Sequence, residues 1–94
     1  MSEVLIVLDI KTADKETLDK YILKEGFFCV ENEPFAYMGA STTPASNTIA
    51  YIFEVFSKAF ELAGVEECRL ICQIDPYAPA IYLYKKDEFF TALK

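Results

Sequence analysis

The stretch TPASNTIAYIFEVFSKAFELAG, residues 43–64, has the spacing of a long amphipathic helix around which the other elements can be arranged. At about 100° per residue, one apolar stripe of this helix contains Ile49, Ile52, Phe53, Phe56, Phe60 and Ala63. Thr43 followed by Pro44 predicts an N-cap with proline at the first helical position. Gly64 stands where such a helix should end.

A second apolar stripe beside the first widens the surface that this helix has to cover. Its members are Tyr51, Val55, Ala59 and Leu62. The two stripes together span roughly 200° of the helix, whereas a helix packed on one side needs only ~100°. We therefore expect the first stripe to pack on the chain's own sheet and the second stripe to need another cover.

The remaining apolar segments predict strands and one further helix. Segment 4–10 is apolar on both alternating sets until Asp9, which is typical of a strand with both faces covered. Thr12 or Asp14 is expected to cap a first helix that ends near Glu25. Further strands are predicted at 27–31, 35–40, 68–75 and 80–84, and Asp87 is predicted to cap a last helical turn over Phe89, Phe90 and Leu93.

This order of elements predicts an α+β fold. The sequence β-α-β-β-α-β with an extra C-terminal strand is that of a ferredoxin-like split β-α-β two-layer sandwich. Right-handed crossovers then place the first strand between the third and the fourth. We expect residues 1–94 to form a single domain of this kind.

Both predicted helices pack on the same face of the sheet, so the other face is left bare. Apolar side chains on that face would contact water in a monomer, and such patches usually mark an interface. We therefore expect a homodimer. The predicted interface residues are Leu5, Val7, Tyr51, Val55, Leu62, Tyr82 and Tyr84.

Composition excludes several classes of function. The net charge of −6 argues against a nucleic-acid partner, because phosphate binding usually needs a basic surface. The absence of histidine excludes Ser-His-Asp and Cys-His catalytic sites within one chain. Cys29, Cys68 and Cys72 lie in apolar runs, which favours buried, reduced thiols in a cytoplasmic protein. No run approaches the ~20 apolar residues of a membrane span, so no membrane partner is expected.

Asp9 is the most suggestive polar residue because it follows the most apolar strand. In the predicted topology its carboxylate lies near the start of the third strand, at Glu33, and the start of the fourth, at Glu66 and Glu67. Carboxylates of this kind could hold Mg²⁺. The other interpretation is that Asp9 only ends a strand and that the glutamates are ordinary loop residues.

The strand LIVLDI, residues 5–10, carries a resemblance to known families. A strand ending in Asp9, within a β-α-β-β-α-β chain of this length, resembles the CRISPR-associated small nucleases, the VapD toxins and the GhoS-type antitoxins. In the first of these families an aspartate at this position, paired across a dimer, holds the catalytic metal. The resemblance therefore implies that Asp9 would be a catalytic, metal-binding residue.

The acidic composition and the single arginine, Arg69, depart from that pattern. We therefore expect a small homodimeric protein with a regulatory or protein-binding role and no cofactor. The alternative is a metal-dependent endonuclease that uses Asp9 and Mg²⁺.

Overall fold

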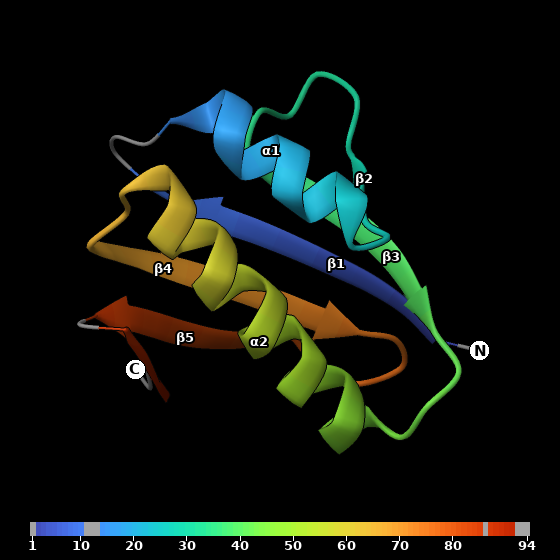
Figure 1. Ribbon diagram of the computed structural model, residues 1–94. Coiled ribbons are helices and arrows are strands. Elements are labelled where there is room, and N and C mark those ends of the chain that lie inside the picture. The colour runs from blue at the N-terminus through green and yellow to red at the C-terminus, as the bar shows by residue number, and fades with distance from the viewer. Residues whose placement is uncertain (1, 11–13, 86, 92–94) are drawn as a thin grey trace.

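Two helices lie on one face of a six-stranded antiparallel sheet in the computed structural model, which describes residues 2–10, 14–85 and 87–91 (Figure 1). The elements are β1 (Ser2–Asp9), α1 (Lys15–Lys24), β2 (Phe28–Cys29), β3 (Ala36–Ser41), α2 (Ala45–Ala63), β4 (Glu67–Ile74), β5 (Ala80–Lys85) and β6 (Glu88–Thr91). The sheet order is β2-β3-β1-β4-β5-β6. The α+β prediction is confirmed, and β1 lies between β3 and β4 as expected. Neither helix in the described residues is long and apolar enough to cross a membrane.

The long helix α2 ends at Gly64, as its sequence predicts. Gly64 has a φ of 77°, in the left-handed region that glycine adopts at helix ends. The predicted start is wrong by one residue, because Pro44 and not Thr43 is the N-cap. Pro44 has a φ of −58° and a ψ of 153°, which is extended backbone. The Thr43 hydroxyl is instead within hydrogen-bond distance of the hydroxyls of Ser41 and Thr48.

The core lies between the helices and the sheet, and aromatic rings fill much of it. Phe56 is fully buried, and its ring meets the rings of Phe27 at 5.4 Å and Tyr37 at 5.9 Å between centroids. Phe60 continues this cluster toward Tyr84, 4.7 Å away. The first stripe predicted for α2 therefore packs on the chain's own sheet.

Helix α1 covers half of the second stripe of α2. It begins after Asp14, whose carboxylate accepts a hydrogen bond from the Thr17 backbone N–H; Thr12, the other predicted cap, lies outside the described residues. Leu18 and Ile22 of α1 are buried in the same cluster as Val55 of α2. Val55 is therefore covered by helix α1 of the same chain and not by a partner. The prediction of Val55 as an interface residue is wrong.

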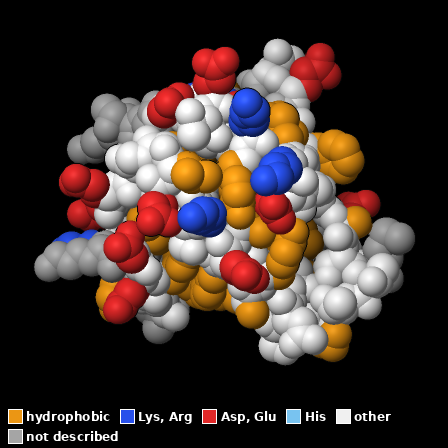
Figure 2. All heavy atoms as spheres, in the orientation of Figure 1, with side chains coloured by type: hydrophobic (Ala, Val, Ile, Leu, Met, Phe, Trp, Pro, Cys, Tyr) orange, Lys and Arg blue, Asp and Glu red, His pale blue; other side chains and the backbone are white. Residues whose placement is uncertain are grey.

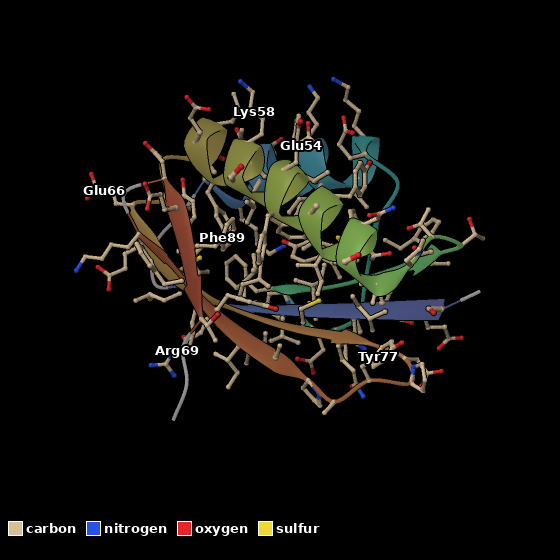
Figure 3. The ribbon with its side chains drawn as sticks, turned by 90° about the horizontal axis from the view of Figure 1, so that it is seen from below. Glu54, Lys58, Glu66, Arg69, Tyr77 and Phe89 are labelled. Atoms are coloured by element: carbon tan, nitrogen blue, oxygen red, sulfur yellow. The ribbon has the colours of Figure 1, made fainter. Side chains whose placement is uncertain are left out.

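The C-terminal segment is a strand and not the predicted helical turn. Lys85 pairs with Glu88 across a tight hairpin, and Asp87 between them has a φ of 65°. Positive φ at this position is typical of a two-residue hairpin turn. β6 places the Phe89 ring 4.4 Å from that of Phe53, between the sheet and α2 (Figure 3). Leu93, the last residue of the predicted turn, lies outside the described residues.

Candidate functional site

Asp9 is exposed at the end of β1 on the face of the sheet opposite the helices, which we call the open face. Its register partner on β4 is Arg69, whose side chain points away from the helices in Figure 3. Asp9, Glu66, Glu67 and Arg69 line an open depression of about 650 Å³. The predicted approach of the end of β1 to the start of β4 is therefore confirmed, but the cross-strand neighbour of the carboxylate is a basic residue.

The four predicted metal ligands do not come together as one group. Glu33 is exposed in the loop before β3 and does not line the depression that contains Asp9. Among the described residues, no three carboxylate, thiol or imidazole side chains form a group that could hold a metal ion. Arg69, opposite Asp9 on the neighbouring strand, adds a positive charge to this end of the sheet and so disfavours a divalent cation there.

The predicted interface residues do not lie on one surface. Leu5 and Val7 lie on the open face, whereas Tyr51 and Leu62 are exposed on the helix-bearing side. Tyr84 is buried in the core and joins Val55 as a wrong prediction. Tyr82 is half-buried with its ring 4.8 Å from that of Phe53, on the helix side of the sheet. The two tyrosines of β5 therefore face the helices, and the side chains that alternate with them face outward.

The open face carries a continuous row of apolar side chains that crosses all six strands. Cross-strand pairing joins Phe28 to Met38 and Met38 to Leu5, then Val7 to Ile71 and Ile71 to Ile81, and finally Leu83 to Phe90. We call these eight residues the apolar band: Phe28, Met38, Leu5, Val7, Ile71, Ile81, Leu83 and Phe90. Phe28 is 68% exposed and Phe90 is 48% exposed, so the two ends of the band protrude most.

Sequence reasoning found only Leu5 and Val7 of this band. The alternation of β4 was a usable signal, because Ile71 is an apolar residue between Arg69 and Gln73 on the polar set. The segment AIYLY, residues 80–84, gave no such signal, since it is apolar at every position. Phe90 could be placed only by the pairing of β6 with β5.

Charged side chains border the band but do not interrupt it. On the open face Asp9 is opposite Arg69, Glu67 is opposite Lys85, and Lys85 is also opposite Glu88. Each basic side chain on this part of the face thus has an acidic neighbour. The helix-bearing side differs, because acidic and basic side chains are spread among its apolar ones (Figure 2).

A second hollow, of about 380 Å³, lies between the first turns of α2, the end of β3 and residues 25–27. Three of the hydroxyl groups that line it have partners, because Ser41, Thr43 and Thr48 are within hydrogen-bond distance of one another. Tyr51 donates to the backbone carbonyl of Glu25 at 2.9 Å. These contacts fix the start of α2 against the loop after α1, which is a structural role.

The buried titratable groups also have structural partners. Tyr37 donates a hydrogen bond to the Asp19 carboxylate, which also pairs with Lys15, and burial followed by this bond raises the pKa of Tyr37. Burial raises the pKa of Cys68 to about 12 and that of Cys72 to about 11, so both remain thiols at neutral pH. Cys29 is exposed, which corrects the prediction that all three cysteines are buried.

Comparisons with protein-family models, with curated proteins and with solved structures find no significant match for this chain. A function for the chain therefore has to be argued from the geometry and chemistry of its own surfaces.

Proposed function

We propose that this chain is a small protein-binding domain with a regulatory role, and that the apolar band on its open sheet face is the binding surface. The observation that carries the proposal is the continuity of the band across six strands, from Phe28 on β2 to Phe90 on β6. Exposed apolar patches of this extent on small proteins usually mark interaction sites.

The size of the hydrophobic term supports a binding role. Full burial of one large apolar side chain contributes about 1.5–3 kcal/mol relative to full exposure. Five of the eight band residues are between 40% and 68% exposed and the other three less so, so covering all eight would contribute on the order of 5–9 kcal/mol. Association costs an estimated 4–15 kcal/mol in lost freedom. The two terms are of similar size, so a partner gains most by covering the whole band.

The architecture supports a ferredoxin-like assignment for the core of the domain. The first four strands have the order β2-β3-β1-β4, and a helix follows β1 and β3. We propose that these elements form a ferredoxin-like split β-α-β unit, to which β5 and β6 add two strands at one edge, and that residues 1–94 are one domain. The three cysteines are unpaired, which suits the reducing conditions of the cytoplasm, and we propose that location.

Radical footprinting of the band in cells tests the proposed function. The labelling of Met38, Phe28 and Phe90 is measured by mass spectrometry in intact cells and in purified protein diluted to nanomolar concentration. Protection of these residues in cells, relative to the dilute protein, is the expected result. Leu23 and Leu62, which are exposed on the helix side, are internal controls and should label equally in both samples. Equal labelling of the band in both samples would show that nothing covers it and would refute the proposal.

A further inference from the structure

We infer that the partner of the open face is a second copy of this chain, packed sheet against sheet with the two apolar bands in contact. This inference rests on the proposed function, because it names the occupant of the same surface.

The shape of the band is compatible with contact between two copies. A two-fold contact requires a surface that is complementary to itself. Val7 and Ile71, on the two central strands, lie at the middle of the band, and a phenylalanine protrudes at each end, on β2 and on β6. A two-fold axis between the sheets, directed along or across the band, therefore places one band over the other. No charged side chain lies within the band.

The charges around the band permit the approach of a second acidic chain. The chain carries a net charge of −6, which would oppose association at a uniformly acidic face. Arg69 and Lys85 are the cross-strand neighbours of Asp9, Glu67 and Glu88 on the open face, so the negative charge at this end of the face is partly balanced. Glu3 is a further exposed acidic side chain at the other end of β1.

The dimensions of the face are near those that a dimer needs. The central strands have eight residues each, about 26 Å at ~3.3 Å per residue, and six strands at ~4.8 Å spacing span about 29 Å. Because β2 and β6 are short, the usable area is roughly 500–700 Å². Standard interfaces bury about 800 Å² on each partner. The expected dimer is therefore at the lower end of stable interfaces and dissociates on dilution.

Light scattering of the purified protein from nanomolar to high micromolar concentration tests the inference. The mass should rise from 10.7 kDa toward twice that value. Leu5→Glu should stay monomeric over the same range. Leu62→Glu is the matched control, because Leu62 is 49% and Leu5 40% exposed on opposite sides of the molecule, and it should dimerise like the parent. Phe90→Glu, on the edge strand, provides a second band variant if Leu5→Glu lowers the melting temperature.

The outcomes separate this inference from the proposed function. A protein that remains monomeric at every concentration, while its band is protected in cells, would overturn the inference and leave the proposed function standing with a different partner. A dimer that survives both band variants, or that Leu62→Glu dissociates, would place the contact between copies elsewhere and overturn the inference. The proposed function would fall as well only if the band also labels equally in cells and in dilute protein.

Discussion

Replacing Phe56 by alanine should remove the centre of the core and lower the free energy of unfolding by about 3–5 kcal/mol. The ring is fully buried, and besides Phe27 and Tyr37 it also meets Phe60, at 6.1 Å between centroids. Each aromatic pair contributes about 0.5–1.5 kcal/mol beyond burial, so the loss should fall in the upper half of that range. A chain of this length has only roughly 5–14 kcal/mol in total.

Thermal unfolding followed by circular dichroism measures this effect. At about 4–8 °C per kcal/mol in a domain of this size, a loss of about 4–5 kcal/mol lowers the melting temperature by roughly 16–40 °C. Phe28→Ala is the matched control, because the same atoms are removed from a ring that is 68% exposed. That variant should change the free energy of unfolding by no more than about 0.5 kcal/mol in dilute protein. A Phe56→Ala protein that melts within a few degrees of the parent would refute the assignment of the buried side of α2.

Three further predictions concern Asp9, the thiols and Gly64. If Asp9 binds no metal, about 10 mM Mg²⁺ should leave the melting temperature of the parent and of Asp9→Asn nearly unchanged. A metal at 100 times its Kd would add about 2.7 kcal/mol to the free energy of unfolding, so binding would be visible as a rise in the melting temperature. A rise in the parent that Asp9→Asn abolishes would support the endonuclease alternative. Burial raises the pKa of Cys68 and Cys72 from 9.0 to about 12 and about 11, so a thiol reagent should label only Cys29 in the folded protein. The stability that comes from burying these neutral thiols should be complete below pH 9 and should be lost as the pH rises toward the folded-state pKa values of about 11 and about 12. Gly64→Ala should cost about 1–2 kcal/mol in chemical denaturation, since a φ of 77° is strained for alanine although its Cβ would meet open space.

Local signals in the sequence predicted the elements that depend on them. The 3.6-residue spacing of α2 and the glycine at its end both lie within one segment of the sequence, and the helix and its C-cap at Gly64 are confirmed. The central position of β1 followed from its apolar residues on both faces. The N-cap of α2 was missed by one residue, because the fixed φ of proline suits both a first helical residue and an extended N-cap, and only its ψ of 153° tells them apart.

Features that depend on pairing between distant residues could not be read in this way. The segment 80–84 is apolar throughout, so its sequence does not say whether Tyr82 and Tyr84 or Ile81 and Leu83 face the core. The answer comes from β6, which pairs with β5 and places Phe89 next to Tyr84, at 5.1 Å between ring centroids. Without β6, β5 is an edge strand and its tyrosines look like a contact surface, which is why Tyr84 was wrongly predicted.

The width of an apolar surface indicates how much cover it needs but not which chain supplies the cover. The second stripe of α2 was a sound reason to expect another packing partner, and α1 supplies it at Val55. The same reasoning applied to β1 has no such answer among the described residues, because both helices lie on the other face of the sheet (Figure 1). The need for cover at Leu5 and Val7 is shared by the whole apolar band, and this shared need is the physical reason for the contact that we propose with a second molecule.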